Sequence, residues 1–195
     1  MSSRQEILAR IRQQRLPETA YPAPSGTWIT FADRVVQFSQ VLQSVGGQVH
    51  VLAPGEDLTQ VLRSLPCLQD ARQIVCALPD VPLGNVDCEP GSDPHSLAGV
   101  DVAIVPGEFG VAENGAVWVE GRRVPPRAVL FLTQHLVLVT PRDQLVDHLH
   151  AAYERIRFDE PGYGLFISGP SKTADIEQSL VIGAHGPRSC TVVLT

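Results

Sequence analysis

The chain has 195 residues, which suits one domain of ordinary size. Hydrophobic residues make up 44% and charged residues 18%, a composition that excludes disorder throughout the chain. The net charge of −6 argues against a broad surface for nucleic acid or an acidic membrane, but it leaves room for a local basic pocket that binds a small anion. No apolar run approaches the roughly 20 residues that span a bilayer, and the start lacks the apolar core of a secretory signal. We therefore expect a cytoplasmic protein.

The cysteines give no sign of a metal centre. They are Cys67, Cys76, Cys88 and Cys190. No two of them form a C-x-x-C pair, and no spacing fits an iron–sulfur cluster or a zinc finger. We predict reduced, mostly buried thiols and a chain that holds no metal or other cofactor of its own.

Residues 1–26 are expected to form a helical arm and a linker. Ser3-Arg4-Gln5-Glu6 has the form of a capping box, and the apolar residues that follow it share one helical stripe. Three prolines in residues 16–26 exclude a continuing helix. The arm is predicted to pack on the domain formed by residues 27–195 or on a partner.

The next part of the chain alternates between helical and strand patterns. Apolar residues at helical spacing predict helices, and short runs of β-branched residues predict strands. The helices are expected at residues 32–45 and 57–65, and the strands at residues 48–52, 73–78 and 101–105. This alternation predicts an α/β fold, an open and mostly parallel sheet with helices on both faces.

Strand patterns dominate the remainder of the chain. We predict strands at residues 115–119, 128–132, 135–139, 163–168 and 190–194, a helix at residues 142–157, and a short helix that begins near Ala174. The gap at Thr133-Gln134 is short enough for a tight turn between two of these strands.

The stretch from Ser168 to Glu177 lies between a predicted strand and a predicted helix. Such junctions place free backbone N–H groups and the positive end of a helix dipole at the carboxyl edge of a sheet. Gly169 allows a close approach of the backbone, Ser171 and Thr173 offer hydroxyls, and Lys172 adds a positive charge. The stretch therefore suits a phosphate or a carboxylate. The other interpretation is that Ser171 or Thr173 simply caps the helix.

Two further turns carry groups that suit a ligand. In His185-Gly-Pro-Arg188, the imidazole titrates near neutral pH and the guanidinium can clamp a carboxylate or phosphate. The other interpretation is a turn with a solvated arginine and a histidine bonded to backbone. In the glycine-bounded turns of residues 107–115, Glu113 can act as a base or a nucleophile. The other interpretation is that Glu113 and Asn114 bond to the turn backbone.

The C-terminal half of the chain resembles the lactate utilisation protein C (LUD-domain) family. The resemblance is carried by Gly169-Pro-Ser-Lys-Thr-Ala-Asp-Ile-Glu-Gln178 followed by His185-Gly-Pro-Arg188. A second segment, Ala112-Glu-Asn-Gly-Ala-Val-Trp-Val119, is similar to the family's A-E-T-G-T stretch. The chain departs from it at Asn114 and Ala116, where the family usually shows Thr. This turn therefore lacks the two hydroxyl groups that those threonines would supply.

The resemblance implies a fold related to the sugar-phosphate isomerase and CoA-transferase superfamily. It also implies a role in oxidising L-lactate to pyruvate beside iron–sulfur-type partner subunits. The first hypothesis is therefore a non-redox component of that system, which binds a small anion and uses His185 or Glu113 for proton movement. The anion-binding residues would be Gly169, Ser171, Lys172, Thr173 and Arg188.

Two alternatives stay open. The Glu-Asn-Gly turn is similar to that of class I CoA-transferases, in which the glutamate is the nucleophile. The second hypothesis is thus an independent acyl-transfer or isomerase enzyme that acts on an anionic small molecule through Glu113. The third is a pure assembly or regulatory module, in which the loop that begins at Gly169 serves as an interface. The sequence leaves open whether the chain catalyses anything alone and whether it forms a homo-oligomer.

Overall fold

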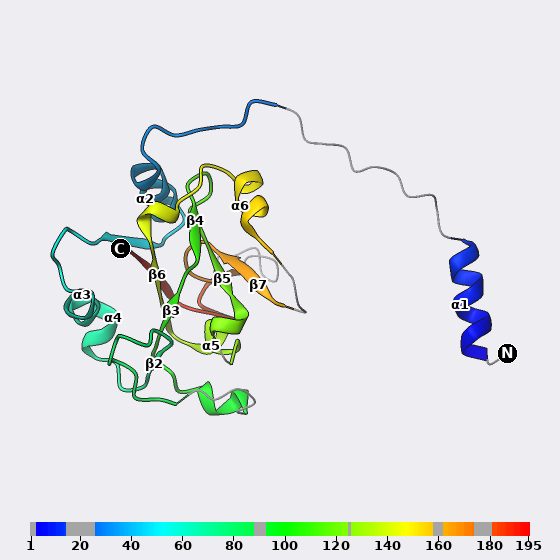
Figure 1. Cartoon of the computed structure of the whole chain (residues 1–195). Helices are drawn as coiled ribbons and strands as arrows, with labels where there is room; N and C mark the ends of the chain where they lie inside the picture. Colours follow the sequence, from blue (N-terminus) through cyan, green and yellow to red (C-terminus); the bar gives the residue numbers. More distant parts are fainter. Residues whose placement is uncertain (1–2, 15–25, 88–92, 125, 158–161, 174–180) are drawn as a thin grey trace.

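A five-stranded parallel sheet forms the centre of the protein. The computed structural model describes residues 3–14, 26–87, 93–124, 126–157, 162–173 and 181–195. The strand order of the sheet is β1-β10-β6-β3-β2, and every neighbouring pair is parallel (Figure 1). The strands are β1 (Gln48–Val51), β2 (Ile74–Cys76), β3 (Val102–Pro106), β6 (His135–Thr140) and β10 (Ser189–Leu194). The prediction of an open parallel sheet is confirmed.

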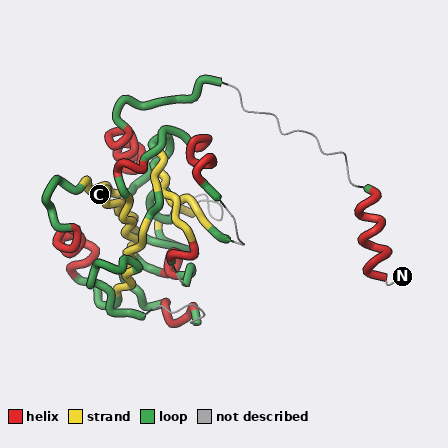
Figure 2. The backbone as a smooth tube through the Cα atoms, viewed as in Figure 1, coloured by secondary structure: helices red, strands yellow, loops and turns green. Residues whose placement is uncertain are grey.

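Helices cover both faces of this sheet. Successive strand residues point to opposite faces, so β3 contributes to two separate cores. Val102 and Ile104 pack toward α3 (Leu58–Ser64) and α4 (Pro66–Gln69), whereas Ala103 and Val105 pack in the core that contains α2 (Arg34–Ser44). Figure 2 shows the strands at the centre with the helices around them. The predicted α/β class is therefore confirmed.

A second, antiparallel sheet packs on the α2 side of the first. Its order is β4-β5-β7, from β4 (Phe109–Val111), β5 (Ala116–Glu120) and β7 (Gly164–Ile167). Val117 and Val119 point into the core shared with the parallel sheet. Phe109 and Trp118 point outward and are covered by α6 (Leu149–Arg155). The strands expected at residues 115–119 and 163–168 thus exist, but in this sheet.

Residues 128–132 were predicted as a strand, and this prediction is wrong. They form α5 (Val129–Leu132), one turn of helix in which Thr133 N donates to Val129 O at 3.2 Å. Two neighbours, Val129 and Leu130, are buried and the next two are exposed, which is the pattern of a helical turn. A strand here could not have joined β6, because β3 and β10 already pair with both its edges.

The helix predicted at residues 142–157 is interrupted. It consists of the 3₁₀ turn η3 (Arg142–Gln144) and of α6, with an extended segment between them. In that segment Val146 N donates to Gly110 O at 2.8 Å, and Ala112 N donates to Val146 O at 2.8 Å. The backbone therefore pairs with the edge of β4 instead of continuing the helix, and Val146 becomes buried.

The outer side of β2 is covered by the loop that follows it. Ile74 N donates to Asn85 Oδ1 at 2.7 Å, and Asn85 N donates to Ile74 O at 2.9 Å. The Asn85 side-chain amide also donates to Arg72 O at 2.7 Å. The backbone groups of Ile74 on the outer side of this edge strand are thus hydrogen-bonded by the chain's own loop.

The remaining elements are short or peripheral. They are α1 (Ser3–Gln13), the 3₁₀ turns η1 (Pro94–Leu97) and η2 (Gly121–Arg123), and the antiparallel pair β8 (Lys172–Thr173) and β9 (Val181–Ile182). The predicted N-terminal helix thus forms; α1 has no buried residue and lies apart from the sheet in Figure 1. The linker and the helix expected from Ala174 fall on residues outside the described ranges, and the division of the chain near residue 26 stays a prediction. Among the described residues, no helix is long and apolar enough to cross a membrane.

Candidate functional site

The structure brings two of the predicted segments together. Ser171 N donates to Pro187 O at 2.9 Å, and Gly183 N donates to Ser171 O at 3.0 Å. A Cβ atom at Gly186 would lie 2.9 Å from the Ser171 Cβ, so only glycine permits this approach without a shift. The stretch that begins at Gly169 and the turn that contains His185 therefore form one unit.

A hollow of about 320 Å³ lies beside this unit, and we call it the loop hollow. Its apolar part comes from α5, the start of β6 and strand β7. Its rim includes Ser168, Gly169, Ser171 and His185. The volume is at the small end of the range of about 300–1,000 Å³ that is typical of ligand pockets. The arrangement suits a small molecule with one apolar end and one polar end.

Gly169 is required by the backbone path at the edge of the loop hollow. Its φ is +76°, and a Cβ atom there would lie 2.9 Å from the carbonyl oxygen of Val45, at the end of α2. Next to it, the Ser168 hydroxyl donates to Asn114 O at 2.8 Å. The loop is thus held against both α2 and the turn that carries Glu113.

The Glu113 carboxylate is engaged with the start of α6. Its Oε2 accepts a hydrogen bond from Leu149 N at 3.0 Å, and Glu113 N donates to Asp147 O at 2.9 Å. Asn114 Oδ1 accepts a hydrogen bond from Ala116 N at 3.0 Å within the turn. Both side chains therefore bond to backbone. A role for Glu113 as a base or nucleophile stays a prediction.

The loop hollow does not lie at the carboxyl edge of the parallel sheet, where sequence reasoning placed it. The strand before the loop, β7, belongs to the antiparallel sheet, so the rule for parallel strands does not apply to it. After the turn, Arg188 N donates to Gln134 O at 2.8 Å, next to the first residues of β6 and β10. Lys172 and Thr173, predicted as part of a loop, form strand β8, in which Lys172 is exposed. The helix N-terminus expected to hold the anion lies outside the described residues.

Arg188 lines a different hollow from His185. This second hollow, which we call the Arg188 hollow, has a volume of about 490 Å³ and lies at the amino ends of the parallel strands. Its lining includes His135, whose Nδ1 lies 2.8 Å from Ser189 Oγ. Burial, together with the positive charge of Arg188, lowers the pKa of His135. No local pattern in the sequence indicates this contact, because Ser189 lies 54 residues further along the chain, on β10.

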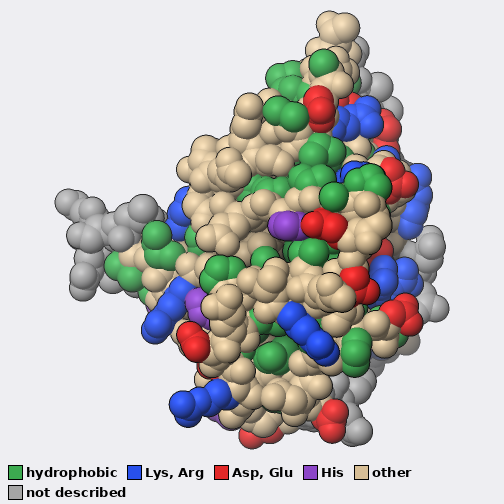
Figure 3. Space-filling view, turned by 90° about the vertical axis from the view of Figure 1, so that its left-hand side faces the viewer, with side chains coloured by type: hydrophobic (Ala, Val, Ile, Leu, Met, Phe, Trp, Pro, Cys, Tyr) green, Lys and Arg blue, Asp and Glu red, His purple; other side chains and the backbone are tan. Residues whose placement is uncertain are grey.

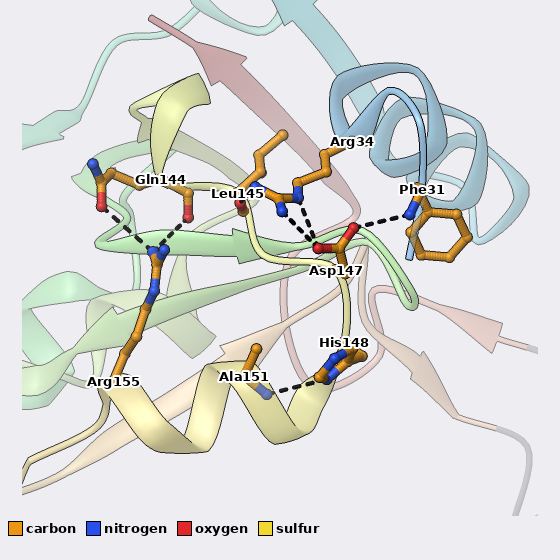
Figure 4. Close-up of polar contacts among 8 residues, drawn as sticks. All are labelled: Phe31, Arg34, Gln144, Leu145, Asp147, His148, Ala151 and Arg155. Carbon is orange, nitrogen blue, oxygen red and sulfur yellow. Dashed lines mark hydrogen bonds and ion pairs between the residues drawn. The ribbon is translucent and has the colours of Figure 1, made fainter. Parts of the chain in front are cut away.

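A buried carboxylate fixes the chain between η3 and α6 (Figure 4). Asp147 Oδ1 accepts a hydrogen bond from Phe31 N at 3.0 Å, and Oδ2 accepts one from Arg34 Nε at 2.9 Å. Arg34 also donates to Leu145 O at 3.3 Å. The Arg34 hydrogen bond, helped by that of Phe31 N, holds the pKa of Asp147 below its usual value. Sequence reasoning missed this pair, whose members are 113 residues apart.

Metal binding has no support in the described part of the chain. There, no group of three His, Cys, Asp or Glu side chains could hold a metal ion. Cys67, Cys76 and Cys190 are free thiols, and Cys88 lies outside the described residues.

These features define an α/β protein in which an antiparallel sheet packs on an open parallel sheet and two hollows lie near the amino ends of the parallel strands. The family model of the LUD domain matches residues 94–195, which is more than half of the chain. The chain therefore belongs to the LUD domain family, as the resemblance predicted.

Sequence comparison finds relatives of the chain under the name Lactate utilization protein C. The chain is 37% identical over 101 residues to Lactate utilization protein C of Shouchella clausii, and 36% identical over 105 residues to that of Halalkalibacterium halodurans. Each match covers 48% of this chain and 44% of the relative, so the chain spans less than half the length of these relatives. An uncharacterized protein of Neisseria meningitidis serogroup B is 25% identical over 219 residues, covering 99% of this chain and 93% of its own.

A solved structure has the same fold. The crystal structure of a DUF162 family protein from Deinococcus radiodurans superposes with a TM-score of 0.60 at 18% identity. The match covers 83% of this chain and 95% of that one. It confirms the arrangement of strands and helices described above.

Proposed function

We propose that the chain is a non-redox component of an L-lactate utilisation system and that it binds a small carboxylate in the loop hollow. The observation that carries the proposal is the convergence of residues 169–171 and 185–187 on one hollow. These are the segments that resemble the family signature, and relatives of the chain bear the name Lactate utilization protein C.

The chemistry of the loop hollow supports a molecule of the size and polarity of lactate. Leu136 and Phe131 supply apolar surface for a methyl group, while the Ser171 hydroxyl and the His185 imidazole supply hydrogen bonds for a carboxylate and a hydroxyl. Lys172 follows Ser171 in the chain but is exposed in β8 and does not line this hollow. Because Arg188 lines the neighbouring hollow, we do not include it among the groups that contact this ligand.

The proposed division of labour follows from the reaction. Oxidation of L-lactate to pyruvate releases two electrons and two protons. Iron–sulfur-type partner subunits would take the two electrons one at a time. His185, which lines the hollow, would accept the proton of the lactate hydroxyl, and the second proton, from the broken C–H bond, would pass to solvent water. The partners and the reaction are part of the proposal.

Complementation of a deletion strain tests the role. The strain should fail to grow on L-lactate and recover with the wild-type gene. It should not recover with a Ser171→Ala, His185→Ala double variant. Arg63→Gln, an exposed change on α3, serves as the control and should restore growth. Normal growth of the deletion strain on L-lactate would overturn the proposed role, and full recovery with the double variant would overturn the proposed site.

A further inference from the structure

The Arg188 hollow is lined by polar side chains that the proposed function does not use. It is separated from the loop hollow by one step of the backbone, because Pro187 lines the loop hollow and Arg188 lines the other.

An unpaired cation and an unpaired anion face this hollow. Both Arg188 and Asp70 line it. Within the described part of the chain, neither side chain forms a hydrogen bond or an ion pair, with each other or with another residue. A guanidinium binds a carboxylate through two parallel hydrogen bonds, whereas a carboxylate suits an ammonium group. The hollow therefore offers a ligand the guanidinium of Arg188 and the carboxylate of Asp70.

The stem of the Arg188 side chain lies close to Gly183. A Cβ atom at Gly183 would lie 2.5 Å from Arg188 Cγ, and Gly183 has a φ of +76°. Only glycine at this position leaves room for the stem without a shift. Gly183 thus lies against the stem of Arg188, and Arg188 itself is exposed to solvent.

The pair of His135 and Ser189 adds uncharged hydrogen-bonding groups. Burial and the nearby Arg188 charge lower the pKa of His135, which favours the neutral imidazole at pH 7. Its Nδ1 lies 2.8 Å from Ser189 Oγ. In either tautomer, the pair keeps one donor and one acceptor for a ligand.

The charge around the hollow argues against a polyanion. Asp101 also lines it, and its carboxylate accepts hydrogen bonds from Gln73 N and Arg72 N, which lower its pKa and keep it charged. Two carboxylates therefore stand against one guanidinium. On the face of the protein that carries α3 and α4, basic and acidic side chains are interspersed rather than gathered by sign (Figure 3). Phosphates of nucleotides would meet repulsion here.

We infer that the Arg188 hollow binds a small zwitterion of the amino-acid class. The carboxylate of the ligand lies on Arg188 and its ammonium group on Asp70. The His135–Ser189 pair contacts a polar ligand side chain. The volume of about 490 Å³ leaves space for that side chain.

Titration calorimetry on the full chain tests the inference with L-serine, L-alanine and L-aspartate, and with L-lactate and ethanolamine as single-charge probes. At least one of the three amino acids should bind more tightly than either probe. Arg188→Gln and Asp70→Asn should each weaken that binding about tenfold or more, because each removes a charge-assisted contact. The matched controls Arg63→Gln and Asp143→Asn change the same charges away from the hollow and should bind like the wild type.

Three outcomes would overturn the inference. The first is no saturable binding of any of the three amino acids. The second is binding that Arg188→Gln leaves unchanged while its thermal midpoint equals that of the wild type. The third is tighter binding of L-lactate than of the amino acids with a loss on Arg188→Gln, which would identify an anion site instead. None of these results depends on growth on L-lactate, which tests the loop hollow.

Discussion

Replacing Asp147 by asparagine should lower the free energy of unfolding by about 2 kcal/mol. The carboxylate bonds with one oxygen to Phe31 N and with the other to the Arg34 guanidinium, whose closest nitrogen lies 2.7 Å away. An asparagine keeps one acceptor oxygen, and its amide N–H₂ faces a donor at the other position. One buried hydrogen bond is therefore lost and a repulsive contact is gained.

The magnitude follows from the exposure of the two partners. Hydrogen bonds to charged groups contribute about 1.5–3 kcal/mol each when they are well buried. The Asp147 side chain is 11% exposed, but that of Arg34 is 49% exposed, so water replaces part of the lost interaction. We therefore expect a value in the lower half of that range.

Urea unfolding at pH 7 measures the effect, with tryptophan fluorescence as the signal, since Trp118 is buried in the folded state. With a slope of about 2 kcal/mol per molar urea, the midpoint should fall by about 1 M. Asp143→Asn, an exposed carboxylate on η3, removes the same charge and should leave the midpoint unchanged. A shift below about 0.2 M at an unchanged slope would refute the reasoning.

The same pair predicts a pH dependence. Because the Arg34 hydrogen bond lowers the pKa of Asp147 in the folded state, its contribution is fully present above the unfolded value of about 3.9. It is lost as the pH falls through the lower, folded value. The stability difference between wild type and Asp147→Asn should thus shrink as the pH falls below about 4. A difference that stays constant down to about pH 2 would contradict this assignment.

Three further predictions concern the site and the core. Gly169→Ala should lower the thermal midpoint and reduce the free energy of unfolding by about 2 kcal/mol, because the positive φ of Gly169 and its close approach to α2 both disfavour a Cβ atom. Glu113→Ala should lower the free energy of unfolding, measured in urea, by about 1 kcal/mol, because the hydrogen bond to Leu149 N is lost. Glu113→Gln keeps an acceptor oxygen and should have the stability of the wild type. Burial raises the pKa of Cys190 to about 12, so iodoacetamide at pH 8 should label it, by mass spectrometry, far more slowly than the half-buried cysteines.

Each of these has a contrary result. A wild-type midpoint for Gly169→Ala would mean that the loop can leave α2 without cost. Equal losses for the two Glu113 variants would mean that the charge, rather than the hydrogen bond, matters at α6. Labelling of Cys190 as fast as that of Cys67 in the folded protein would show that β10 separates readily from its neighbours and exposes the Cys190 thiol.

Local pattern was enough to predict most elements of the parallel sheet. The apolar run at residues 101–105 forms β3. The helix predicted at residues 57–65 forms α3, and the Asp57 side chain caps its start by accepting a hydrogen bond from Gln60 N. Pattern failed at residues 128–132, because valine, leucine and phenylalanine fit a strand or a buried helical turn equally well. The outcome there was decided by the edges of β6, which other strands already occupied.

The structure brings only part of the predicted site to one hollow. Residues Gly169, Ser171 and His185 share one hollow, whereas Arg188 lines another. Sequence reasoning also placed the site at the wrong edge, since it could not tell that β7 joins an antiparallel sheet. The contact between Arg34 and Asp147 left no local signal at all, because it depends on how distant segments pack.

The loop that covers β2 has a consequence for how copies of the protein meet. A bare edge strand can recruit a strand from another molecule and so start aggregation. Asn85 occupies both backbone groups of Ile74 on that side, and Gly84 lies against Cys76 closely enough that a Cβ atom would be 3.2 Å from its nitrogen. The loop thus occupies the outward backbone groups of Ile74, and variants that loosen it should expose these groups to a neighbouring chain.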